Sequence, residues 1–458
     1  MGRKGLIRKG QTDGICIMEM REGNLWKKIL LYSLPLMFTN MLQLLFNTAD
    51  VAIVGKFAGS LSLGAVGSTS LLISLTTGVL IGVSAGVNSV VAFFIGADEK
   101  EKEQKAGDTG FVICLVLGCL VLAIGVLLAR PILSMLGTKD ELIEEAILYF
   151  RIYMLGSPAL AVFNYGNAIL SAEGNTKEPL KYLVLSGVIN VIFNLIFVLG
   201  FGMAAEGVAL ASIIAQYISA ILVMRAIIRS EESYRFDFRN LKLDGRIAAR
   251  VLKIGIPAAM QYALYAVSNL FVQSAVNTFD HVVVEGNSAA MNIDLLVYDM
   301  MAAFYTACTS FIAQNYGANK KDRVLKSYLV TTVYSFGLAV ILGFFVYVFR
   351  YRLLYIFTND PEVVAKGAIR TTVLSVSYCI SAFMDNSSFA SRGLGKTVIP
   401  TIIIMMGTIV FRIVWVYTIF AYFHTLTSLY LVYGCAFAVT GLAGNIYFFR
   451  EFRRIRFQ

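Results

Sequence analysis

Three polar side chains share one face of the first long apolar stretch of this chain. Gln43, Asn47 and Asp50 follow i, i+4, i+7 spacing, so on an α-helix they lie one above the other. A carboxylate inside an apolar helix costs roughly 2.5–3.5 kcal/mol on membrane-insertion scales, so it normally faces a cavity or a partner. We predict that Asp50 binds a coupling ion, H⁺ or Na⁺, and that Pro35 bends the same helix. The alternative is that Asp50 caps the outer end of that helix.

Paired asparagines recur further along the first half. Asn190 and Asn194 are one helical turn apart, and we predict that they bind the ion together with Asp50 and Asn47. The one metal ion that we expect this set of residues to bind is Na⁺, at Asp50, Asn190 and Asn194. Hydrogen bonding between helices is the alternative function of such amides.

The second half carries its own polar stripe. Gln261, Tyr265, Asn269 and Gln273 repeat every fourth residue, which indicates either a cavity wall or packing between bundles. Arg412 is predicted to pair with an acidic side chain or to extend toward the cytoplasm. The predicted substrate-cavity residues are Gln43, Asn164, Asn167, Gln261, Tyr265, Asn269, Asp294 and Asp385.

Motifs for other chemistry are missing from the sequence. It contains no G-x-x-x-x-G-K-[ST] loop for nucleotide binding and no cysteine spacing typical of a metal site. We therefore predict no enzymatic activity and no cofactor other than H⁺ or Na⁺. The energy for any transport would come from an ion gradient.

Composition indicates the elements that hold these residues. Of the 458 residues, 57% are hydrophobic and 15% are charged, and the charges lie between apolar runs. We count twelve such runs, each near the ~20 residues that cross a bilayer as a helix. The fold class is therefore an all-α polytopic membrane protein.

The net charge of +10 is concentrated at the N-terminus, in every second loop and at the C-terminus. That asymmetry predicts that both termini are cytoplasmic in a multi-pass inner-membrane protein. The basic tail is expected to face anionic lipid headgroups, and no nucleic-acid partner is expected.

The chain repeats itself. Gly174 to Pro179 and Gly395 to Pro400 both read G-x-T-x-x-P, and Gly96-Ala97-Asp98 matches Gly317-Ala318-Asn319 at the same offset. Such repeats, with six helices each, predict two parallel, pseudo-twofold bundles. The predicted segments are a polar leader at 1–25, an N-lobe at 26–228, a cytoplasmic linker at 229–250, a C-lobe at 251–450 and a basic tail at 451–458.

The combined motifs resemble the multidrug and toxic compound extrusion (MATE) family over nearly the whole chain. They are Pro35…Gln43…Asn47-x-x-Asp50…Gly55, Gln314-Asn315-x-Gly317-Ala318, Glu173-Gly174-x-Thr176-x-x-Pro179 and Arg392-Gly393-x-Gly395-x-Thr397-x-x-Pro400. The resemblance implies twelve helices in two lobes forming a V, and export of organic cations in exchange for inward Na⁺ or H⁺. It also implies ion coupling at Asp50 and a bend at Pro35.

Three positions depart from the family pattern. Relatives often have an acid where this chain has Asn194, and those coupled through the C-lobe have a Glu at the position of Tyr265. Their other C-lobe acid aligns near Ser381, one turn before Asp385.

We predict a monomeric antiporter that exports organic cations, drugs or metabolites. A lipid-linked oligosaccharide flippase of the same superfamily is the nearest alternative, and it would need a basic central cavity. A membrane-embedded transferase or hydrolase would need a cluster of catalytic side chains, and a channel would conduct continuously.

Overall fold

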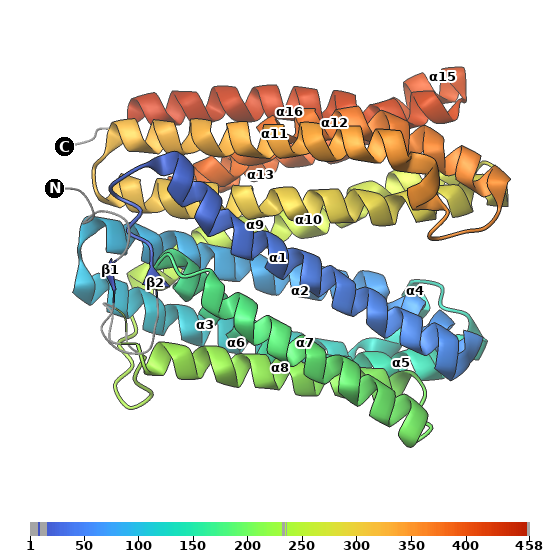
Figure 1. The fold of residues 1–458 in the computed structure, drawn as a ribbon, viewed down its shortest axis with the longest axis horizontal. Helices are drawn as coiled ribbons and strands as arrows, with labels where there is room; N and C mark the ends of the chain where they lie inside the picture. The colour runs from blue at the N-terminus through green and yellow to red at the C-terminus, as the bar shows by residue number, and fades with distance from the viewer. Residues whose placement is uncertain (1–7, 10–15, 231–233, 235, 456–458) are drawn as a thin grey trace. The chain divides into compact units, whose positions relative to one another are not determined.

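The computed structural model describes residues 8–9, 16–230, 234 and 236–455, and nearly all of these residues are helical (Figure 1). Residues 1–7 and 10–15 of the predicted leader lie outside this range, as do residues 456–458 of the predicted tail. In the leader, β1 (Arg8–Lys9) pairs antiparallel with β2 (Cys16–Ile17).

The first half of the chain forms a series of apolar helices. They are α1 (Leu25–Ile53), the π-helical turn η1 (Val54–Ala58), α2 (Gly59–Ala97), α3 (Lys100–Leu127), α4 (Ala129–Met135), α5 (Asp140–Met154), α6 (Ser157–Ala172), α7 (Lys177–Leu195), the π-helical turn η2 (Ile196–Gly200) and α8 (Ala205–Ile228).

The second half repeats this pattern. Its elements are α9 (Gly245–Val276), α10 (His281–Gly317), α11 (Lys321–Leu354), α12 (Pro361–Gly393), α13 (Val398–Ile404), η3 (Met405–Val410), α14 (Phe411–Trp415), η4 (Val416–Phe420), α15 (Ala421–Phe423) and α16 (Leu426–Arg454). Both η3 and η4 are π-helical.

The helices account for the twelve predicted membrane crossings. Nine helical segments of the described chain are long and apolar enough to cross a bilayer. One of these runs for 72 residues from α1 through α2, and since one crossing takes about 20 residues it holds two. The bent pair α5 and α6 makes another crossing. The remaining crossing corresponds to α9, a helix of 32 residues that also carries the polar stripe.

By residue contacts the chain divides into two compact units. Unit 1 contains Met1–Glu19 and Phe38–Ala259, and unit 2 contains Met20–Met37 and Met260–Gln458. The division falls inside α1 two residues after Pro35, and inside α9 two residues after Pro257. A proline removes one backbone hydrogen bond of a helix, so both helices are weakened close to the residue where they change units.

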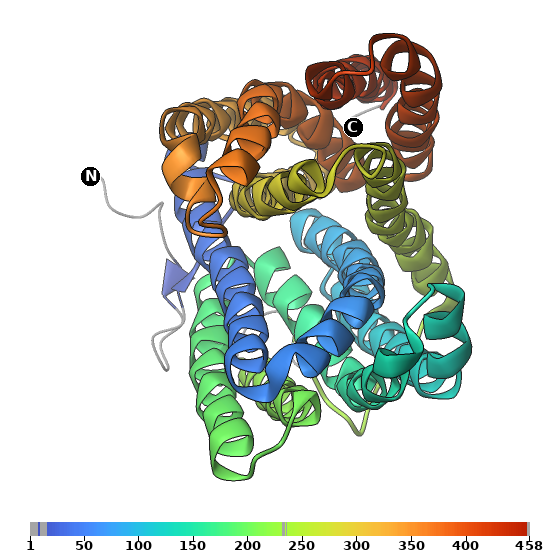
Figure 2. The same cartoon turned by 90° about the vertical axis from the view of Figure 1, so that its right-hand side faces the viewer.

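Within each unit the helices run side by side, and Figure 2 views them nearly end-on. In unit 2, α12 packs against α10, α11 and α16 around a core of buried aliphatic and aromatic side chains. In unit 1, α6 packs against α2, α3 and α8. These bundles hold the polar residues of the predicted sites in place.

The repeated turns take the same backbone form in both halves. Gly174 and Gly395 have φ of 92° and 74°, a conformation that glycine adopts without steric cost. Pro179 and Pro400 lie in the first turns of α7 and α13, where their missing amide hydrogens break no helical bond. After α2 and α10, Asp98 and Asn319 are both left-handed.

The described part of the predicted linker is fastened to α3 of unit 1. The buried carboxylate of Asp108 accepts hydrogen bonds from the Tyr234 hydroxyl (3.2 Å) and the Lys242 amide (3.0 Å). At the end of the linker, Asp244 accepts from the backbone amides of Arg246 and Ile247, which holds the pKa of this carboxyl below its usual range.

Candidate functional site

Asp50 lies near the C-terminal end of α1, four residues before the π-helical turn η1 begins. Its carboxylate is half-buried and is held from two other helices of unit 1. The Asn194 amide of α7 donates to Oδ1, and the Ser212 hydroxyl of α8 donates to Oδ2 at 3.0 Å. Asp50 therefore faces the interior of unit 1 rather than lipid.

The two asparagines of α7 complete the cluster. The Asn194 amide also donates to the Asn190 oxygen at 3.3 Å, and the Asn190 amide donates to the Ser212 hydroxyl at 3.3 Å. Both asparagines are buried, with Asn194 fully so. Each of the four side chains of the cluster, from Asp50, Asn190, Asn194 and Ser212, therefore forms hydrogen bonds with two of the other three.

One atom of this cluster has no partner in the described chain. The amide oxygen of Asn194 is buried and accepts no hydrogen bond. A buried carbonyl oxygen without a donor costs free energy, and a cation would satisfy it. The oxygens of Asp50, Asn190, Asn194 and Ser212 form a hard, mostly neutral donor set with one negative charge, which suits Na⁺ or a proton on the carboxylate.

Two of the three helices that carry the cluster, α1 and α7, continue into a π-helical turn immediately beyond it. The π-helical turn η1 starts at Val54, and η2 starts at Ile196, two residues after Asn194. Single π-helical turns inside α-helices are rare and occur often at functional sites, because they leave backbone groups less regularly bonded. The Asp50 cluster therefore adjoins two segments that can change their hydrogen bonding.

A glycine sets the approach of α1 to α7 below the cluster. A methyl group at Gly187 would lie 1.9 Å from the ring of Phe46, one turn before Asp50. Any larger residue at this position would require the Phe46 ring to turn or the two helices to move apart. The position of Asp50 relative to Asn194 thus depends on Gly187.

In unit 2, three of the four residues of the predicted α9 stripe each contact a different buried charged group. The Asn269 oxygen accepts from Arg412 Nη1 at 2.9 Å, and the Tyr265 hydroxyl donates to Asp385 Oδ1 at 3.2 Å. The Gln261 oxygen accepts from Arg392 Nη2 at 2.7 Å. The polar side chains on one face of α9 therefore form hydrogen bonds with three buried charged groups inside unit 2.

The fourth stripe residue reaches an ion pair through one intermediate. Gln273 accepts from the Asn287 amide at 2.8 Å, and the Asn287 oxygen accepts from Arg370 at 2.7 Å. Arg370 also makes two contacts with Asp294, of 2.9 Å and 2.8 Å, and the Tyr378 hydroxyl donates to the same carboxylate. Asp294 is thus held by an arginine and a tyrosine.

Arg412 differs from the sequence-based prediction. Its side chain is 2% exposed, so it does not extend to the cytoplasm. It belongs to α14, the short helix between η3 and η4. In the described chain, the Arg412 guanidinium contacts the amide oxygen of Asn269 and the ring of Tyr433, whose centroid is 4.4 Å away, rather than a carboxylate. The prediction was wrong because Arg370 occupies Asp294, and sequence spacing carries no information about that competition.

Other predicted residues lie apart from the Asp50 cluster. Asn47 is exposed and Gln43 is half-buried, and neither joins the hydrogen bonds of Asp50 in the described chain. Asn164 donates to the Leu160 carbonyl and Asn167 accepts from Ser171, both within α6. A role for Gln43, Asn164 and Asn167 in substrate binding stays a prediction, as does a role for Asn47 in ion coupling.

Several residues of these networks were missed by sequence reasoning. Ser212 gives no signal, because a serine in an apolar helix usually bonds to its own backbone. Sequence reasoning assigned no contact to Arg370 or Arg392, yet both are buried in α12, with Arg392 one residue before its end.

Comparisons with known proteins agree with this architecture. A family model described as MatE matches the chain twice, at residues 35–196 and 257–418, which confirms the internal repeat. The probable multidrug resistance protein YoeA of Bacillus subtilis is 24% identical over 387 residues, covering 83% of this chain and 84% of that protein. The probable multidrug resistance protein NorM of Thermotoga maritima is 22% identical over 404 residues, covering 87% and 86%.

The fold also matches solved structures. A crystal structure of MATE in complex with MaL6 superposes with a TM-score of 0.89 at 23% identity, covering 95% of this chain and 98% of that one. At this identity the likeness shows the fold alone, an all-helical architecture in which each half supplies six membrane-spanning helices.

Proposed function

Because the chain belongs to the MatE family, we propose that it is a secondary active antiporter that exports small organic cations in exchange for inward H⁺ or Na⁺. The proposed coupling group is Asp50, and the proposed location is the cytoplasmic membrane with both termini in the cytoplasm. A monomer contains both repeats and would suffice.

The observation that carries this proposal is the Asp50 cluster. It combines one carboxylate, two buried amides and a hydroxyl with an unsatisfied amide oxygen on Asn194. Binding of an ion would neutralise Asp50 and occupy that oxygen, and this would change which groups Asn194 and Ser212 contact. Pro35 and the π-helical turn η1 interrupt the regular hydrogen bonding of α1 and its continuation, so ion arrival would bend α1.

The test uses proteoliposomes loaded with ethidium, a flat organic cation. Efflux would be measured under an imposed Na⁺ gradient and, separately, an imposed proton gradient. We expect one gradient to accelerate wild-type efflux and the Asp50→Asn protein to lose that acceleration. Asp140→Asn is the matched control, since Asp140 is an exposed carboxylate at the start of α5.

Full gradient-driven efflux by Asp50→Asn would refute the coupling role. If neither gradient accelerated wild-type efflux of ethidium or of two further organic cations, the proposed substrate class would be wrong.

The flippase alternative needs basic groups available to a pyrophosphate. In the described chain, unit 2 buries three arginines, Arg370, Arg392 and Arg412. Their contacts described above lie inside unit 2, with Asp294, Gln261 and Asn269 respectively. Arg370 is thus paired with a carboxylate and the other two guanidinium groups bond to amide oxygens within unit 2, so the exporter remains our proposal.

A further inference from the structure

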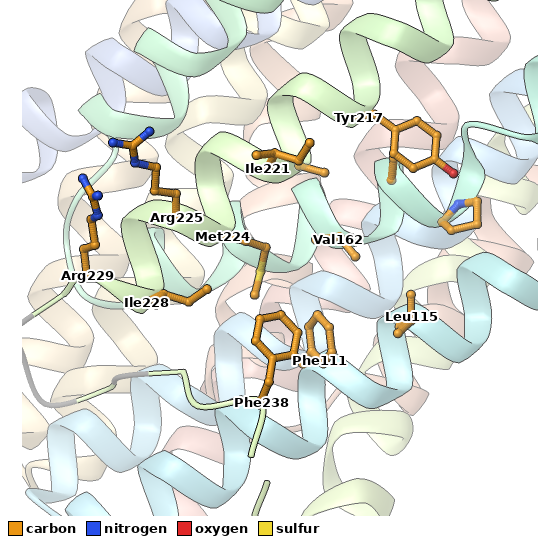
Figure 3. Close-up of a pocket in the computed structure, with 13 residues that line it drawn as sticks. Phe111, Leu115, Val162, Tyr217, Ile221, Met224, Arg225, Ile228, Arg229 and Phe238 are labelled. Carbon is orange, nitrogen blue, oxygen red and sulfur yellow. The ribbon is translucent and has the colours of Figure 1, made fainter. Parts of the chain in front are cut away.

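A groove of about 500 Å³ opens on unit 1, away from the Asp50 cluster. Its walls come from α3, α6 and α8, with Phe238 of the linker closing one side (Figure 3). Val162 and Met224 lie along it, and Phe111 packs against Phe238 with ring centroids 6.0 Å apart. The volume falls in the range of ligand sites, and the lining is almost wholly apolar.

Two arginines mark one end of this groove. Figure 3 shows Arg225 and Arg229 together at one end, with Tyr217 at the opposite end. Both arginines are exposed, and they are one turn apart at the C-terminus of α8. Like charges at this spacing repel each other. An anion placed between them would remove that repulsion.

The described chain supplies no carboxylate to either arginine. On the neighbouring helix α7, the carboxylate of Glu178 forms an ion pair with Lys181 at 2.6 Å. Glu231 and Glu232 follow Arg229 in the sequence and lie outside the described residues. The positive end of the groove is therefore open to an external anion as far as the structure describes it.

The length of the groove fits one leaflet of a bilayer. From Tyr217 to Arg229, α8 rises about 18 Å at 1.5 Å per residue. Half of the ~30 Å hydrocarbon core is about 15 Å. An acyl chain lying along the groove would thus reach the middle of the bilayer while its headgroup stayed level with the arginines.

We propose that this groove binds one anionic glycerophospholipid of the cytoplasmic leaflet. The acyl chain lies against Val162 and Met224, and the phosphate lies between Arg225 and Arg229. Arginine suits this role, because its planar guanidinium can donate two hydrogen bonds to one phosphate. The inference rests on the proposed cytoplasmic position of the α8 C-terminus, but not on the exported substrate or the coupling ion.

Lipid charge should decide occupancy. A phosphatidylglycerol headgroup carries a net negative charge, whereas the choline of phosphatidylcholine would bring a cation toward two guanidinium groups. Because Phe238 forms one wall, a bound lipid would also touch the linker that joins the halves of the chain. Basic pockets between membrane helices on the cytoplasmic side are suited to anionic headgroups.

The test is native mass spectrometry of the purified full-length protein, titrated in mild detergent with phosphatidylglycerol or phosphatidylcholine. We expect wild type to retain one phosphatidylglycerol at concentrations where phosphatidylcholine is lost. Arg225→Gln/Arg229→Gln should bind phosphatidylglycerol at least tenfold more weakly, since each basic residue near an anionic surface contributes about a factor of five.

Two further variants make the result specific to the groove. Val162→Phe should displace the acyl chain while leaving both arginines in place. Arg450→Gln/Arg453→Gln removes two exposed charges from the end of another membrane helix, α16, and should retain the lipid as wild type does. Thermal unfolding of each variant confirms that it is folded.

Three outcomes would overturn the proposal. Equal retention of both lipids by wild type would remove the charge preference. Equal losses from the two double-arginine variants would show general surface attraction. Undiminished binding by a folded Val162→Phe protein would show that the headgroup binds without the groove. None of these results depends on ethidium efflux, so they leave the proposed antiport untouched.

Discussion

Asn269 accepts a hydrogen bond of 2.9 Å from Arg412, and this contact joins α9 to the centre of an otherwise apolar α14 in unit 2. The arginine is 2% exposed and lies against Tyr433. Removing a partner from a buried charged group costs about 1–3 kcal/mol or more, because the group cannot regain water.

We therefore expect Asn269→Leu to lower the stability of the protein by about 1–3 kcal/mol. Thermal unfolding in detergent would show it as a reduced midpoint. Asn292→Leu is the matched control, since Asn292 is exposed and bonds to the Ser288 carbonyl of its own helix. Equal midpoints for the two variants would mean that the Asn269 contact does not stabilise Arg412.

The Asp294–Arg370 pair makes a sharper prediction about stability. Breaking a buried ion pair from one side typically costs 3–5 kcal/mol, roughly, since it leaves the other charge uncompensated. Asp294→Asn should therefore destabilise unit 2 severely, measured as lower yield and a lower unfolding midpoint.

A double variant separates charge compensation from packing. Asp294→Leu/Arg370→Met removes both charges and should recover most of the lost stability. If Asp294→Asn were as stable as wild type but inactive, Asp294 would serve the substrate, as the sequence predicted, rather than the fold.

Ser212 was not predicted from the sequence, and its hydroxyl donates to Asp50 Oδ2. Ser212→Ala should slow gradient-driven ethidium efflux several-fold without abolishing it, because Asn194 still holds Oδ1. The net contribution of one such hydrogen bond to stability is only about 0.5–1.5 kcal/mol. Efflux rates in proteoliposomes are the measurement.

The control for this change lies on the same helix. Ser219 of α8 bonds to Ser186 and not to Asp50, so Ser219→Ala should leave the gradient dependence of efflux intact. Identical efflux in Ser212→Ala and wild type would exclude the hydroxyl from ion coupling.

Gly187 controls how closely α1 approaches α7. A methyl group there would lie 1.9 Å from the Phe46 ring, so Gly187→Ala must push the helices apart or turn the ring. Overpacking of this kind costs about 1–3 kcal/mol. We expect slower efflux together with a lower unfolding midpoint.

A smaller side chain at position 46 should relieve the clash. Gly187→Ala/Phe46→Leu is therefore expected to recover efflux, while Gly200→Ala should have little effect because no atom lies within 4 Å of its added methyl. Failure of the double variant to recover would show that Gly187 matters for another reason.

Helical periodicity and the cost of burying charge account for what could be predicted. Gln43, Asn47 and Asp50 share a helix face by spacing alone, and Asp50 was singled out because a carboxylate there is costly. The structure brings Asp50 to Asn194, as expected, but leaves Asn47 exposed. The face from Gln43 to Asp50 spans two helical turns. Which of these turns contacts another helix depends on tertiary packing.

The sequence alone determined the twelve crossings, the internal repeat, the glycine turns and the carboxylate of α1, because these follow from residue type and local spacing. Tertiary structure decided the partners: Ser212 with Asp50, Arg370 with Asp294 and Asn269 with Arg412. Each of those contacts joins helices far apart in the chain, where several groups compete for one charge. Their choice depends on which helices pack together and how closely, and residue spacing within a single helix does not contain that information.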